Sequence, residues 1–174
     1  MDLDLEKALD EPVDLSHQFD VTSQRLERDD VLSLSPVSFS GHLRKADTGF
    51  VLDGQLSFDG TTTCARCLKP VSFRRSGPVS WVFAPSHEKN AVGEDEEVEL
   101  SARDLDIVWY DDFVVPFDPL IDEQVLLELP MKALCRDDCR GLCPMCGSDR
   151  NVAACSCVEP TDDRWSALKA LRPR

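Results

Sequence analysis

Apolar and polar residues alternate along the chain after its first thirty residues. The apolar members are Val37, Phe39, Leu43, Val51, Leu56 and Phe58, with polar residues between most of them. An alternation with a period of two is typical of strands that bury one face. We therefore predict two antiparallel strands joined by a turn at residues 46–49. Further strand-like runs lie at residues 61–64, 70–73 and 79–83, with a break at 76–78. They extend the two strands into a β-meander or barrel-like sheet.

The segments around this alternation carry weaker patterns. The first thirty residues are polar and weakly periodic, and we expect an arm with one short strand. Residues 85–99 are acidic and poor in apolar side chains, which predicts a mobile acidic loop. Residues 98–115 return to strand character.

Two helices are predicted in the last third of the chain. Asp118 and Pro119 are typical of an N-cap followed by proline at the first helical position, and Pro130 ends this helix. Its apolar residues are Leu120, Ile121, Val125, Leu127 and Leu129, and the helix should pack on the sheet. A short terminal helix is predicted over residues 161–171, with an apolar face formed by Trp165, Leu168 and Leu171.

These elements predict an α+β fold that is mainly β, with an antiparallel sheet, one packed helix and a C-terminal zinc-knuckle appendage. At 174 residues the chain is long enough to bury a core without cross-links. We expect residues 1–130 to form an acidic β-rich domain. Residues 131–174 are expected to form a cysteine-rich zinc-binding module that ends in the terminal helix.

Composition narrows the class of protein. The chain is 42% hydrophobic and 30% charged, which is ordinary for a globular protein, and it contains no apolar run of about 18 residues. Fibrous and integral membrane classes are therefore excluded. The N-terminal residues lack the basic and apolar regions of a signal peptide, so we expect a cytoplasmic protein.

Charge is distributed unevenly along the chain. The net charge of −14 argues against a nucleic-acid partner, yet residues 61–80 carry four basic and no acidic residues, and residues 131–174 carry eight basic and six acidic residues. These two segments also hold every cysteine. We consider their cations as RNA contacts, with a solvated strand edge as the alternative for the first four: Arg66, Lys69, Arg74, Arg75, Arg136, Arg140 and Arg150.

The cysteines indicate metal binding more than disulfides, because the cytosol keeps thiols reduced. The CPMCG sequence at 143–147 is typical of a turn that aims two thiolates at one ion. Two further cysteines about ten residues downstream complete a tetrahedral set. The leading site is Cys143, Cys146, Cys155 and Cys157.

A second site uses the remaining thiols, which are Cys64, Cys67, Cys135 and Cys139. It would clamp the C-terminal module to the sheet. Two alternatives remain: Cys135 or Cys139 joins the leading site in place of Cys155 or Cys157, and Cys64 with Cys67 form a structural or redox pair. We expect one or two ions of structural zinc, with iron as the alternative metal.

No catalytic constellation accompanies these sites. The three histidines are scattered over the predicted arm, strand and loop, and the sequence contains no GxSxG, phosphate-loop or HExxH motif. An all-cysteine site also leaves no open coordination position for a substrate. We therefore expect that the protein is not an enzyme and binds no small-molecule substrate.

Taken together, the motifs resemble the YceD family of large ribosomal RNA subunit accumulation proteins. The residues that carry the resemblance are CARCLKP at 64–70, LLELP at 126–130, LCRDDCRGLCPMCG at 134–147 and DRWSAL at 163–168. The resemblance spans about residues 10–172, and the cysteine-rich tail is similar to the actinobacterial and Gram-positive branch. Where the family usually has Asp-Pro-Arg, this chain has Asp162, Asp163 and Arg164, which bears only on where the last helix begins.

The resemblance implies a cytoplasmic bacterial ribosome-biogenesis factor that supports accumulation or processing of large-subunit ribosomal RNA. We interpret the basic cysteine-bearing face as a contact for precursor RNA or for a pre-ribosomal particle. The alternative is a metal-stabilised protein–protein adaptor that holds a basic ribosomal protein and never touches RNA.

Overall fold

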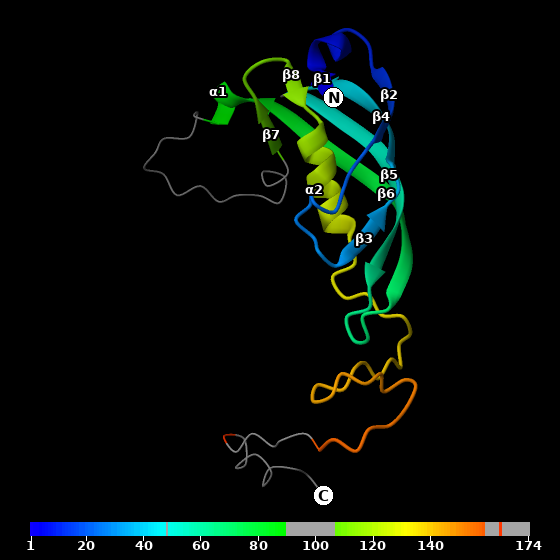
Figure 1. Cartoon of the computed structure of the whole chain (residues 1–174). Helices are drawn as coiled ribbons and strands as arrows, with labels where there is room; N and C mark the ends of the chain where they lie inside the picture. Colours follow the sequence, from blue (N-terminus) through cyan, green and yellow to red (C-terminus); the bar gives the residue numbers. More distant parts are fainter. Residues whose placement is uncertain (48, 90–106, 159–163, 165–174) are drawn as a thin grey trace, which may run out of the picture.

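The computed structural model describes residues 1–47, 49–89, 107–158 and 164 (Figure 1). A six-stranded sheet forms the body of this part of the chain. Its strands, in spatial order, are β2 (Val13–Phe19), β4 (Val37–Ala46), β5 (Gly49–Thr63), β6 (Pro70–Pro85) and β7 (Ile107–Tyr110). Strand β3 (Val31–Leu34) pairs with β5 beyond the end of β4, and β1 (Asp2–Asp4) pairs separately with β8 (Val114–Pro116).

The mainly β fold with an antiparallel meander is confirmed. Strands β4, β5 and β6 follow one another as antiparallel neighbours, and β4 buries alternate residues as the hydrophobic pattern predicts. Strand β7 differs, because it lies parallel to β6. A parallel pair needs a long crossover connection, and residues 86–106 give the chain that length. The sheet is open in the described residues and does not close into a barrel.

Strand β6 runs without interruption through residues 76–78, where the sequence predicts a break. Pro78 lies opposite Gln55 of β5, and β7 pairs with β6 only from Val82 onward. Within the described part of the chain, β6 therefore has a neighbour on one side only at Pro78. The missing N–H of proline is tolerated at such an edge position.

The N-terminal arm is more ordered than its weak periodicity predicts. Besides β1 and β2 it contains the 3-10 helix η1 (Leu5–Ala8), and Leu3 and Leu5 are buried in the core. A three-residue strand and a single helical turn are too short to produce a readable period.

The predicted acidic loop is partly replaced by regular structure. Pro85 ends β6, and α1 (Ser86–Lys89) follows it. The rest of that loop lies outside the described residues, as does the predicted terminal helix apart from Arg164. The division of the chain near residue 130 stays a prediction.

Helix α2 (Asp118–Glu128) lies across one face of the sheet, as predicted (Figure 1). It begins at Asp118 itself, with Phe117 in the N-cap position, and ends before Pro130. Ile121 and Val125 of the helix are fully buried in the core between the helix and the sheet. No helix in the described part of the chain is both long enough and apolar enough to cross a lipid bilayer.

Phe117 is the centre of an aromatic cluster that joins α2 to the sheet. Its ring is fully buried and meets the rings of Phe19, Phe39 and Trp81 edge to face, with centroid separations between 5.2 and 5.6 Å. Edge-to-face pairs add about 0.5–1.5 kcal/mol each beyond the burial of apolar area. The cluster therefore fixes the start of α2 on the sheet.

The β5–β6 ladder continues to the pair Thr63 and Pro70, so the loop at residues 64–69 lies at one end of the body (Figure 1). After α2 the chain passes this loop, and the N–H of Ala65 donates to the carbonyl of Ala133 (2.8 Å). We call residues 64–69 and 131–158 together the cysteine end.

The close packing of Phe39 against the backbone of the sheet generates a stability prediction. A Cβ atom added at Gly54 would lie 2.5 Å from the Phe39 ring and 2.7 Å from the carbonyl oxygen of Ser40. We expect Gly54→Ala to lower the free energy of unfolding by about 1–3 kcal/mol, because overpacking forces the ring or the strand to move. Urea unfolding followed by circular dichroism measures this change.

Gly77→Ala is the matched control on the neighbouring strand, since a Cβ atom there meets nothing within 4 Å. The control should change the free energy of unfolding by no more than about 0.5 kcal/mol. Equal stabilities for the two variants would contradict the packing described here.

Candidate metal centres

Eight cysteines form two groups of four at the cysteine end. The first group, which we call the hairpin site, consists of Cys64, Cys67, Cys135 and Cys139. The second group, the tail site, consists of Cys143, Cys146, Cys155 and Cys157. Within each group all four sulfur atoms lie within 4.8 Å of one another. The structure thus brings together the two sets of four that the spacing predicts, and it does not mix them.

The sulfur separations fit a tetrahedral ion. In the hairpin site the Cys64 and Cys139 Sγ atoms are 3.9 Å apart, and those of Cys67 and Cys135 are 3.6 Å apart. Metal–sulfur bonds of about 2.3 Å give a tetrahedron whose edges are about 3.8 Å. A disulfide needs sulfurs about 2.05 Å apart, so the geometry suits a shared ion instead.

The tail site begins with a turn that the CPMCG sequence builds. The N–H of Gly147 donates to the carbonyl of Cys143 (2.8 Å), and the N–H of Cys143 donates to the carbonyl of Ser148 (2.8 Å). Gly147 has a positive φ of 71°, which glycine adopts without strain. This turn directs the Cys143 and Cys146 thiols to the same side.

The hairpin site begins with the same turn at the end of β5. The N–H of Leu68 donates to the carbonyl of Cys64 (2.9 Å), and the N–H of Cys64 donates to the carbonyl of Lys69 (2.8 Å). Leu68 occupies the position of Gly147 and has a φ of 62°, a left-handed conformation that costs a non-glycine residue about 1–2 kcal/mol. The chain therefore keeps this turn against a local preference.

Opposite pKa shifts occur within the hairpin site. Burial opposes ionisation of Cys64, but main-chain N–H groups of Arg66, Cys135 and Cys67 donate toward its sulfur, and together they lower its pKa to about 6. The nearby Cys67 sulfur, followed by burial, raises the pKa of Cys135 to about 12. Burial also opposes ionisation of Cys139, but hydrogen bonds from the Gly141 main chain and the Asn151 side chain lower its pKa. Two thiolates are thus favoured, while Cys135 resists further negative charge.

The tail site repeats this division. The main-chain N–H groups of Cys146 and Met145 lower the pKa of Cys143 to about 6. The neighbouring Cys146 sulfur, with burial second, raises the pKa of Cys157 to about 12. Four crowded thiols cannot all ionise alone, whereas a cation among them stabilises all four thiolates.

The two sites differ in exposure. Cys64, Cys67 and Cys139 of the hairpin site are buried, whereas Cys146 and Cys157 of the tail site are exposed. An ion in the hairpin site would therefore be shielded from water and chelators more completely than one in the tail site.

Five of the seven cations predicted to contact RNA lie around the two sites: Arg66, Lys69, Arg136, Arg140 and Arg150. Four of these five side chains contact other groups of the cysteine end. The contacts are Arg66 to the carbonyl of Cys139 (2.7 Å), Lys69 to Asp149 (2.7 Å), Arg136 to Asn151 (2.8 Å) and Arg150 to the Cys143 sulfur (3.9 Å). Arg140 contributes its main-chain N–H to Asn151 (2.8 Å), while its side chain is exposed.

The other two predicted cations lie on β6, away from the cysteines. Arg74 pairs with Asp59 across the β5–β6 ladder (2.6 Å), and Arg75 donates to the carbonyl of Glu128 at the end of α2 (2.8 Å). Both side chains therefore already have partners within the body of the molecule.

Two residues of the cysteine end escaped prediction from the sequence. Asn151 donates from its side-chain amide to the sulfur of Cys139 (3.4 Å), and Asp149 pairs with Lys69. Asparagine and aspartate are common in loops for many reasons, so their presence after the CPMCG turn does not reveal these partners.

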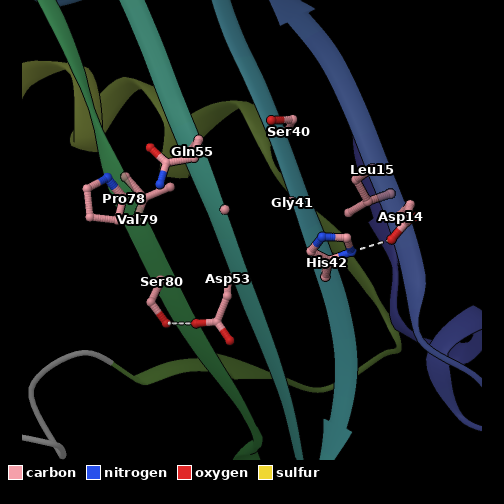
Figure 2. Close-up of a pocket in the computed structure, with 11 residues that line it drawn as sticks. Asp14, Leu15, Ser40, Gly41, His42, Asp53, Gln55, Pro78, Val79 and Ser80 are labelled. Carbon is pink, nitrogen blue, oxygen red and sulfur yellow. Dashed lines mark hydrogen bonds and ion pairs between the residues drawn. The ribbon is translucent and has the colours of Figure 1, made fainter.

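A shallow hollow on the opposite face of the sheet from α2 offers no comparable chemistry. Figure 2 shows its polar side chains on four neighbouring strands, where His42 pairs with Asp14 and Ser80 donates to Asp53 (2.7 Å). All four side chains are exposed to solvent. They satisfy one another in pairs and do not converge on a common point.

Comparisons with known proteins agree with the motifs. A family model described as "Large ribosomal RNA subunit accumulation protein YceD" matches residues 52–172. Uncharacterized proteins of Mycobacterium tuberculosis and Mycobacterium bovis are each 33% identical over 121 residues, which cover 69% of this chain and 54% of the relative. An uncharacterized protein of Mycobacterium leprae is 22% identical over 134 residues, which cover 77% of this chain and 58% of that protein.

The chain spans about half the length of the curated relatives that it matches. These relatives are actinobacterial, which agrees with the branch that the cysteine-rich tail predicts. No solved structure matches the chain.

The cysteine geometry predicts two bound ions per chain and a specific dependence on pH. Without metal, Cys135 and Cys157 hold their protons at neutral pH, because the pKa of each is about 12. Each site must therefore release at least one proton when metal binds, so metal affinity should fall about tenfold or more for each unit by which the pH is lowered. Native mass spectrometry over a pH series counts the ions.

Cys157→Ser should reduce the count to one ion, and the neighbouring Ser156→Ala is its matched control, which should keep two. A wild-type chain that carries no metal ion would contradict both sites, and a single ion would contradict the two-site arrangement.

Proposed function

The chain belongs to the YceD family of large ribosomal RNA subunit accumulation proteins, and from this membership we propose that it is a cytoplasmic ribosome-biogenesis factor. It supports the accumulation or processing of large-subunit ribosomal RNA. The observation that carries the proposal is the family match over residues 52–172, which takes in most of the long β5–β6 hairpin and all eight cysteines.

Structural zinc is the proposed metal of both sites. Four thiolates satisfy a tetrahedral zinc ion completely and leave no position open for a substrate. Such an ion supplies cross-linking: it would join the hairpin loop to the segment after α2 and close the tail site on itself. The protein residues supply the positioning, through the two turns that begin at Cys64 and Cys143.

We further propose that the cysteine end contacts precursor RNA or a pre-ribosomal particle. Residues 61–80 and 131–158 together contain eight basic and three acidic residues, beside a strongly acidic body. A divalent ion held by four thiolates leaves two negative charges at each site. Most of the basic charge is therefore balanced locally, and individual exposed cations must make the contact. Arg140 is the clearest candidate, because its side chain is exposed and, among the described residues, makes none of the contacts that hold Arg66, Lys69 and Arg136.

A protein–protein adaptor is the second candidate function, and one observation favours it. Leu68, Met145 and Val152 at the cysteine end are 62%, 57% and 79% exposed. Apolar side chains gain more from burial against a protein than from contact with phosphate. In this alternative the acidic body attracts a basic ribosomal protein and no RNA is contacted.

The family role predicts a change in ribosomal RNA when the protein is depleted from cells. The ratio of large- to small-subunit ribosomal RNA should fall, and wild-type protein should restore it. A Cys143→Ser/Cys146→Ser variant should not restore the ratio, because the tail site loses two of its ligands. Ser156→Ala, expressed to the same level, is the matched control that should restore it. A ratio that never moves on depletion would remove the proposed role.

The RNA contact predicts a charge effect at Arg140. Arg140→Glu should reduce co-sedimentation with large-subunit particles several-fold and lower the slope of log affinity against log salt by about 0.7–0.9, the value for one lost phosphate contact. Arg44→Glu is the matched control, since Arg44 is exposed on β4 opposite Val51, near the other end of the ladder.

Nuclease treatment of the same particles separates the two candidate functions. Association through RNA should vanish after digestion, whereas association through a ribosomal protein should persist. Equal co-sedimentation of the two charge variants would argue against contact by Arg140.

A further inference from the structure

Side chains connect the two cysteine sites. Each of these side chains lies in sequence near the ligands of one site but contacts the other site. Asn151 lies in sequence between two ligands of the tail site, Cys146 and Cys155. Its amide nevertheless donates to the sulfur of Cys139 in the hairpin site (3.4 Å). Its amide oxygen accepts from the main-chain N–H of Arg140 (2.8 Å), which fixes the residue next to that ligand. A tail-site loop thus positions a hairpin-site thiol.

A second connection runs in the opposite direction. Lys69 follows the hairpin-site ligand Cys67 by two residues, yet its ammonium group pairs with Asp149 (2.7 Å). Asp149 forms a β-bridge with Leu142, and this bridge closes the loop that holds the first two ligands of the tail site. The carboxylate also accepts from the main-chain N–H of Asn151 (2.8 Å), so the two connections meet at Asp149.

The main chain reinforces these side-chain contacts. The carbonyl of Arg66 accepts from the N–H of Leu142 (2.9 Å), and the Arg66 guanidinium donates to the carbonyl of Cys139 (2.7 Å). Gly141 lies so close that a Cβ atom there would be 2.7 Å from the Arg66 carbonyl oxygen. The short segment between the last hairpin-site ligand and the first tail-site ligand is therefore seated on Arg66.

We propose that the two sites bind metal cooperatively, with Asn151 and the Lys69–Asp149 pair transmitting the occupancy of one site to the other. An ion in the hairpin site locks the loop at 64–69 onto the segment after α2, and this holds Arg66 and Lys69 where they order the tail-site loop. The tail site then loses less conformational freedom when its own ion binds. By thermodynamic linkage, an ion in the tail site strengthens the hairpin site by the same factor.

The inference rests on metal binding at both sites and is independent of the proposed role in ribosomal RNA accumulation. Because three hairpin-site thiols are buried, that site should hold its ion more tightly, and the tail-site ion should be the first to leave. Cooperativity then appears as a tail-site affinity that depends on whether the hairpin site is filled.

The test measures zinc affinity by chelator competition, with ions counted by native mass spectrometry. Cys67→Ser removes a hairpin-site ligand, and we expect the tail-site affinity to fall about tenfold, within the 5–150-fold range of typical allosteric coupling. Cys157→Ser should weaken the hairpin site by a similar factor. Equal affinities in the wild type and in both single-site variants would overturn the inference.

Asp149→Asn removes the ion pair with Lys69 while leaving all eight thiols in place, so it tests the inference even if a cysteine variant fails to fold. We expect it to weaken the tail site about fivefold or more in the otherwise wild-type chain and to have little further effect in the Cys67→Ser background. Asp138→Asn is the matched control: Asp138 pairs with Arg136 (3.3 Å) beside the hairpin site and should leave the tail-site affinity unchanged.

The outcomes separate this inference from the others. Two ions bound with no effect of Asp149→Asn would overturn the coupling and leave the metal sites intact. A wild-type chain that binds no zinc would overturn both the coupling and the sites. The cellular ratio of ribosomal RNAs tests the biological role separately.

Discussion

The continuous ladder between β5 and β6 is the constraint on which both ends of the molecule depend. At one end its inner face, with Phe50 opposite Phe83, contributes to the core on which α2 packs. At the other end the pair Thr63 and Pro70 is the last of the ladder, and the loop that follows it carries Cys64 and Cys67. A slip of the register by one residue would turn the inner face outward and displace both thiols. The same ladder of backbone hydrogen bonds therefore determines which side chains enter the core and where the cysteine loop lies.

Electrostatics explains why basic residues gather where the cysteines do. Main-chain N–H groups favour a thiolate at Cys64 and at Cys143, but all four thiols of a site can ionise only when cations lie near them, whether these are bound metal or side chains. Arg150 reaches the Cys143 sulfur (3.9 Å) and Lys69 lies beside the hairpin site, so part of the local basic charge offsets the thiolates. A few exposed cations, Arg140 among them, remain available for the proposed external partner.

The sequence by itself determined the elements whose cause is local. The alternation through Val37, Phe39 and Leu43 required a strand with one buried face, and the proline at 130 required α2 to end. The CPMCG spacing likewise determined a turn that aims two thiols at one point, because ligand geometry within a few residues depends little on the rest of the fold. The same local reasoning gave a wrong prediction at residues 76–78. A glycine and a proline usually break a strand, but they are tolerated where that strand has a free edge.

Only the tertiary structure decided which distant groups meet. Three contacts join segments that lie too far apart in the sequence for any periodic pattern to predict them. They are Cys64 with Cys139, Lys69 with Asp149, and Asn151 with the sulfur of Cys139. The parallel placement of β7 beside β6 is of the same kind. Spacing proposes the ligands of a site, but the packing of the β5–β6 hairpin against the chain after α2 selects the partners, because contact energies depend on where the backbone brings each group and not on the order of residues.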